Sequence, residues 1–111
     1  MNESDLQLIK KTLNELASSA GHSQLNTKSI SLLFLDFGLN NDDFEEMFIS
    51  FNQIVFKNEE YNLQMFREIL RKYIPNCTDL TVIRFIDGFA KNYIPELLLF
   101  SEEIKTDFIN R

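Results

Sequence analysis

Helix-breaking residues are rare in this chain, and the stretches between them repeat apolar residues at helical spacing. Glycine and proline together account for only five of the 111 residues, three glycines and two prolines. So few breakers argue against a loop-rich or disordered chain. Between them, apolar side chains recur three or four positions apart, which is the spacing of one face of an α-helix. The sequence therefore predicts an all-α fold.

The breakers and capping residues divide the chain into about six expected helices. The second of these should be the central, most buried helix, because residues 30–35 are apolar on nearly every face. Glycine suits the end of a helix and proline its first turn. The expected helices are one around Leu6 to Leu16 ending at Gly21, one from Asn26 or Thr27 to Phe37 closed by Gly38, one opening at Asn40 or Asn41, one starting at Asn58 to Glu60, one between Pro75 and Tyr93, and one starting at Pro95.

These helices are expected to form one compact bundle of about five to six helices, a single domain over residues 1–111. Two alternatives remain open. Residues 71–75 resemble residues 91–95, each with bases and Tyr-Ile-Pro, which would fit a short solenoid-like stack. Ile49–Phe56 and Thr81–Ile86 have the composition of strands, which would fit an α+β fold. Helix is preferred, because strict alternation and hairpin turns are absent there.

Catalytic and cofactor motifs are absent from the sequence. Nucleophilic catalysis requires a nucleophile beside a base, and the one Cys77 and one His22 lie in no recognisable signature. Cys77 could lie in the first turn of the fifth helix, but an ordinary thiol is the better prediction. The acidic stretch that begins at Asp36 fails the EF-hand spacing, since its third position, counted from Asp36, is Gly38. We expect no enzyme, no cofactor and no metal; Gly88, inside a helical pattern, marks either a close helix approach or a break.

Charge and cysteine usage limit the partners and the compartment. The net charge of −6 disfavours nucleic acid and anionic membrane surfaces. A single cysteine forms no intramolecular disulfide, and the N-terminus lacks the basic and apolar segments of a signal peptide. The apolar runs are too short to span a bilayer. A cytoplasmic protein is the expectation.

Most of the uncompensated charge lies in residues 36–60. This stretch holds seven acids and one base, Lys57, and so carries the charge of the whole chain. One explanation is structural: Asp42, Asp43 and Glu45 are expected in the first turn of the third helix, and Glu59 and Glu60 in that of the fourth, where acids stabilise the helix dipole. The other is a binding patch of exposed phenylalanine within an acidic rim. The predicted partner-binding residues are Asp36, Asp42, Asp43, Glu45, Glu46, Phe48, Glu59 and Glu60.

A small, acidic, helical chain without catalytic residues resembles bacterial toxin-immunity proteins, such as those of contact-dependent growth inhibition and of colicins. The resemblance is one of overall character, with acids such as Asp42, Asp43, Glu45 and Glu46 facing a basic nuclease cleft, and no family motif carries it. It implies a non-enzymatic inhibitor that binds one basic toxin domain, one-to-one, and blocks its active site. The alternative function is a helical adaptor or regulatory subunit whose groove, lined by phenylalanine between the second and third helices, receives a partner's amphipathic helix.

Overall fold

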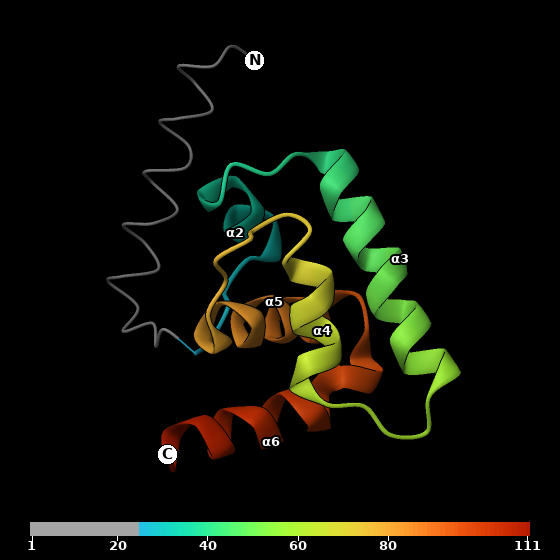
Figure 1. Cartoon of the computed structure of the whole chain (residues 1–111), viewed down its shortest axis with the longest axis vertical. Coiled ribbons are helices and arrows are strands. Elements are labelled where there is room, and N and C mark those ends of the chain that lie inside the picture. The colour runs from blue at the N-terminus through green and yellow to red at the C-terminus, as the bar shows by residue number, and fades with distance from the viewer. Residues whose placement is uncertain (1–24) are drawn as a thin grey trace.

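The computed structural model describes residues 25–111 (Figure 1). Within this range the secondary structure consists of α-helices, one 3-10 turn and no strand, which confirms the all-α prediction and not the α+β alternative. Ile49–Phe56 and Thr81–Ile86, the strand-like segments, are both helical. The first expected helix and His22 lie outside the described residues. The elements are α2 (Ile30–Asp36), α3 (Asn41–Lys57), α4 (Leu63–Leu70), α5 (Asp79–Asn92), η1 (Pro95–Leu97) and α6 (Leu98–Ile109).

Side-chain caps fix where four of these helices begin. The side chains of Ser29, Asn40, Asn62 and Thr78 each accept a hydrogen bond from a backbone N–H in the first turn that follows. At α3 the cap is reciprocal, because Asp43 N–H donates to Asn40 over 2.9 Å and Asn40 N–H donates to Asp43 over 3.0 Å. The start of α3 agrees with the sequence prediction, and Pro95 opens the 3-10 turn that leads into α6 at Leu98.

Two predicted helix starts are wrong. The second helix begins at Ile30 and not at Asn26 or Thr27, because Ser29 supplies the cap and Thr27 is bound to α5 instead. The fourth begins at Leu63 and not within residues 58–60, because Asn62 caps it. The predicted end of α2 is confirmed: Gly38 follows it with φ +72°, a conformation that favours glycine.

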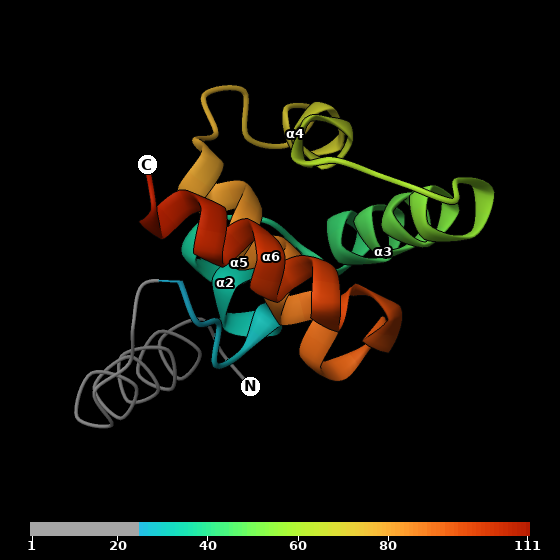
Figure 2. The same cartoon turned by 90° about the horizontal axis from the view of Figure 1, so that it is seen from below.

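The central helix is α5, and the prediction that residues 30–35 would form it is wrong. Eight consecutive or near-consecutive residues of α5, from Val82 to Ala90, are buried, whereas Leu35 in α2 is exposed. Helices α2, α4 and α6 all pack against α5, and Figure 2 shows α6 running along it. A solenoid would limit contacts to sequence neighbours, so this packing around one helix is a bundle.

Gly88 marks a close helix approach and not a break. It lies within the continuous helix α5, where a Cβ atom would be only 2.8 Å from Ile30 Cδ1 and 2.9 Å from Thr27 Cγ2. Glycine therefore lets the start of α2 lie directly against α5.

Phenyl rings fill the space between the other helices and α5. The ring of Phe89 lies 5.1 Å from Phe51, 5.3 Å from Phe44 and 5.9 Å from Phe34, measured between centroids. These tilted and edge-on contacts are the favoured geometries of aromatic pairs. The high phenylalanine content thus serves mainly to pack α3 and α2 onto the central helix.

Candidate partner-binding surface

The acidic segment 36–60 does not form one patch, because α3 separates its two ends. Helix α3 is 17 residues long, which corresponds to about 25 Å along its axis. That is about three times the screening length of roughly 8 Å at physiological ionic strength. In Figure 1, α3 runs along one side of the molecule and the two acidic ends lie at opposite ends of it. Each end must therefore be judged separately.

At the N-terminal end of α3, local structure accounts for much of the charge. Asp42 and Asp43 lie in the first turn, where they stabilise the helix dipole, and Asp43 completes the capping box. Glu46 accepts a hydrogen bond of 3.1 Å from the Tyr73 hydroxyl. Burial, followed by this bond and the charge of Glu46, raises the pKa of Tyr73. Glu45 is exposed and lies beyond the first turn, contrary to its predicted place.

At the other end, the dipole explanation fails. Glu59 and Glu60 were expected in the first turn of the fourth helix, but they lie in the loop before its cap, Asn62. No acid occupies the first turn of α4. Both glutamates are exposed, so neither helix capping nor the helix dipole explains why they are there.

These two glutamates line a groove with residues from η1 and α6. The groove has a volume of about 390 Å³, and four of its seven lining residues are glutamates. We call it the acidic groove; it is formed by Glu59, Glu60, Tyr61, Glu96, Leu99, Phe100 and Glu103. Sequence reasoning missed Glu96 and Glu103, although their helical spacing around Leu99 and Phe100 in the last expected helix was a usable signal.

Three of the residues that line the acidic groove, Tyr61, Leu99 and Phe100, have apolar rings or side chains. The Tyr61 ring meets Phe100 edge-on, with centroids 4.9 Å apart. Burial, followed by the charges of Glu96 and Glu103, raises the pKa of Tyr61. Leu99 is 72% exposed at the edge of the groove. Exposed apolar side chains with a polar rim are a composition found in protein-binding surfaces.

Four bases of the described residues are held away from the acidic groove by two aspartates of α5. Arg67 and Arg111 form ion pairs with Asp79, the first residue of α5. Within α5, Asp87 forms ion pairs with Lys91 and Lys105. Across residues 25–111, no ion pair joins a base to any of the four glutamates of the acidic groove.

Phe48, the predicted aromatic contact, packs on the core. It is half-buried, with its ring 6.1 Å from Phe89 and 5.9 Å from Tyr93 between centroids. Of the five phenylalanines in residues 36–60, Phe56 is the exposed one, at 73%. It lies in the last turn of α3, three residues before Glu59.

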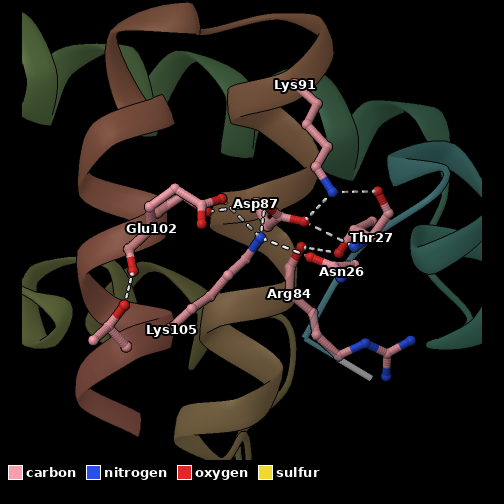
Figure 3. A network of polar contacts seen from close by, with 9 residues as sticks. Asn26, Thr27, Arg84, Asp87, Lys91, Glu102 and Lys105 are labelled. Carbon is pink, nitrogen blue, oxygen red and sulfur yellow. Dashed lines mark hydrogen bonds and ion pairs between the residues drawn. The ribbon is translucent and has the colours of Figure 1, made fainter. Parts of the chain in front are cut away.

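A buried ionic network surrounds Asp87 within α5 and was not predicted (Figure 3). Asp87, 1% exposed, lies 2.6 Å from the ammonium of Lys105 and 2.7 Å from that of Lys91. Its carboxylate also accepts hydrogen bonds from Thr27 N–H over 2.8 Å and Ser101 Oγ over 3.0 Å. Burial acts to raise the pKa of Asp87, but these four donors outweigh it and hold the pKa below its usual 3.8.

This network joins the chain before α2 to α5 and α6. Thr27 also donates through its hydroxyl to the Arg84 carbonyl, and Lys105 donates to Asn26 over 3.0 Å. Ser101 and Lys105 are residue types that can form a nucleophile pair, but both are buried and both are bound to Asp87. Their arrangement stabilises the fold and presents no nucleophile at the surface.

Other candidate sites from the sequence analysis gain no ligand set. Cys77 precedes the cap Thr78 and so lies before the first turn of α5, not in it. Among residues 25–111, no three Cys, His, Asp or Glu side chains are grouped to hold a metal ion. A groove between α2 and α3, lined mainly by Phe34, Leu35, Leu39 and Phe44, measures about 220 Å³. That is smaller than an ordinary small-molecule pocket of about 300 Å³ or more.

In the described part of the chain, no helix combines the length and the apolar character needed to cross a bilayer. None of the family models, curated proteins or solved structures compared with the chain matches it significantly. Functional inference therefore depends on the surface described above.

Proposed function

We propose that this protein is a non-enzymatic inhibitor that binds a basic protein domain, most simply as an immunity protein that neutralises a nuclease-type toxin one-to-one by blocking its active site. The observation that carries the proposal is the acidic groove. Four glutamates without a described basic partner surround Tyr61, Phe100 and the exposed Leu99. At the N-terminal end of α3, Asp43 caps the helix and Glu46 binds Tyr73, so the acidic groove is the better candidate for the binding site.

The glutamates and the apolar side chains of the groove contribute to binding in different ways. The glutamates attract a cationic surface from a distance and accelerate association, by tenfold or more for a strongly charged pair. The apolar side chains of Tyr61, Phe100 and Leu99 supply affinity once water is excluded, with Leu99 as the exposed anchor. A nuclease cleft is basic because it binds phosphates, and an acidic inhibitor competes for the same surface.

The adaptor function is the weaker alternative for the groove between α2 and α3. The volume of that groove, about 220 Å³, is smaller than that of the acidic groove, about 390 Å³. An inhibitor that presents an acidic surface needs no deeper cavity.

Co-expression with the product of the neighbouring reading frame tests the proposal. We expect that product to end in a basic domain that is toxic when expressed alone, harmless when this protein is present, and isolated with it as a one-to-one complex. Replacing Glu59, Glu60, Glu96 and Glu103 by Gln together should slow association and weaken protection. Protection and an association rate that are both unchanged by this replacement, or a neighbouring product that is neither toxic nor bound, would contradict the proposal.

A further inference from the structure

The outward face of α3 carries two exposed apolar side chains that the core does not use. Ile49 is 54% exposed and Phe56 is 73% exposed. They are seven residues apart, so they lie within about 20° of one another around the helix and about 10 Å apart along it. The opposite side of α3 packs through Phe44, Phe48 and Phe51 onto Phe89. The exposed pair is therefore a separate face of the helix.

Acids bound this face at both ends. Asp42 and Glu45 lie on the same side of α3 toward its start, and Glu59 and Glu60 follow its end, all of them exposed. The base of α3, Lys57, follows Phe56 and so points about 100° away from it. An apolar centre between two acidic ends is complementary to an element with an apolar centre and cationic ends.

We propose that this face, Asp42, Glu45, Ile49, Phe56 and the glutamates after α3, docks an α-helix of the basic partner. The spacing selects a helix, because residues seven apart on a second helix are also about 10 Å apart on one face. Residues on one face of a strand lie at multiples of about 6.8 Å, which does not match. This inference rests on the proposed function only for the basic character of the partner. Its surface shares Glu59 and Glu60 with the acidic groove, whereas its apolar centre, Ile49 and Phe56, lies outside that groove.

A second copy of the chain is disfavoured as the occupant. In an antiparallel pair of α3 helices, Asp42 and Glu45 of one copy would meet Glu59 and Glu60 of the other. In a parallel pair each acid would meet itself. Two molecules that each carry −6 also repel one another.

A synthetic peptide tests the inference without the natural partner. The probe is a helical peptide of about 18 residues with two leucines at i and i+7, alanines between them and lysines at both ends. The control peptide has the same composition, with the second leucine moved to i+9, on the opposite side of the helix. Binding is followed by fluorescence anisotropy and by ¹⁵N–¹H NMR shifts of the full chain.

The matched peptide should bind about tenfold more tightly than the control and shift the amides of α3 around Ile49 and Phe56. The double variant Ile49→Ser/Phe56→Ser should lose that preference, while Leu99→Ser, in the acidic groove, should keep it. All three side chains are exposed, so the fold is expected to survive, and far-UV circular dichroism checks this.

Three results would overturn the inference: equal binding of the two peptides, shifts confined to Tyr61 and Phe100, or concentration-dependent dimerisation that Ile49→Ser/Phe56→Ser abolishes. Failure here with protection intact rejects the α3 face alone. Peptide binding at α3 in a protein that fails to protect rejects the proposed function alone.

Discussion

Replacing Gly88 by alanine tests the packing of α2 against the central helix. At an exposed helical position this change would stabilise the chain by up to about 1 kcal/mol, because alanine favours helix. Here the new methyl group would lie 2.8 Å from Ile30 Cδ1, 2.9 Å from Ile30 Cβ and 2.9 Å from Thr27 Cγ2. Carbon atoms pack best at about 3.5 to 4.0 Å.

The clash cannot be relieved by rotating a flexible side chain. Ile30 Cβ and Thr27 Cγ2 are close to their backbones, so the backbone of residues 27–30 must move by several tenths of an ångström. Overpacking of this kind costs about 1 to 3 kcal/mol. The movement also stretches the 2.8 Å hydrogen bond from Thr27 N–H to Asp87, a charged bond worth about 1.5 kcal/mol or more. After subtracting the helix gain, we expect Gly88→Ala to lower the free energy of unfolding by about 2 kcal/mol.

Urea unfolding monitored by circular dichroism measures this loss as a lower midpoint at an unchanged slope. Thr27→Ser is the matched control, because it removes Cγ2 but keeps the hydroxyl that donates to Arg84. In the Thr27→Ser background, Gly88→Ala should cost measurably less, so the double-mutant cycle should show coupling. A higher midpoint for Gly88→Ala, or no coupling to Thr27, would refute the close approach.

The remaining predictions concern the ionic network, a helix cap and the acidic groove. Asp87→Asn should lower the free energy of unfolding by about 3 kcal/mol, because two buried ammonium groups lose their counter-charge. The pKa of Asp87 is lower in the folded chain than its unfolded value of about 3.9, so its contribution to the free energy of unfolding is present above that value and is lost as the pH falls through the folded pKa. In acid titrations, the free energy of unfolding should therefore fall less steeply below about pH 4 in Asp87→Asn than in the wild type. An identical fall in the two proteins would contradict the network. Asn40→Ala should cost about 1 kcal/mol in urea unfolding by removing the α3 cap, and no change would argue against the capping box. Leu99→Ser should leave the unfolding midpoint within about 0.5 kcal/mol of wild type but weaken the partner complex in calorimetry, whereas unchanged affinity would remove Leu99 from the site.

The sequence allowed the helical architecture to be predicted because its signals were local. Apolar spacing, the Asn40 cap and Pro95 each depend on neighbouring residues alone, and the structure has α3 and η1 where those signals place them. The two misplaced helix starts also had local causes that were visible, since Ser29 and Asn62 are good caps. Competing capping residues, Asn26 and Asn58, concealed them.

The central helix and the ionic network depend on contacts between distant parts of the chain. Thr27 and Asp87 are 60 residues apart, and no periodicity reports their hydrogen bond. Asp87 among apolar neighbours was a usable signal of a buried, paired carboxylate. Only half of the acidic groove could be predicted, because Glu59 and Glu60 lie in the acidic segment of the sequence. Glu96 and Glu103 come close to them only through the packing of α6.

The central claim is tested most directly by the rate at which this protein associates with the basic domain of the protein encoded by the neighbouring reading frame. Stopped flow measures that rate at low and at physiological ionic strength. We predict fast association that slows steeply with salt, and a loss of about tenfold or more in rate and of most of the salt dependence when Glu59, Glu60, Glu96 and Glu103 are all replaced by Gln. The control variant Glu68→Gln/Asp107→Asn, with two exposed acids outside both the acidic groove and the α3 face, should have a smaller effect. Equal rates and equal salt dependence for the wild type and the four-Gln variant would contradict a basic partner at the acidic groove.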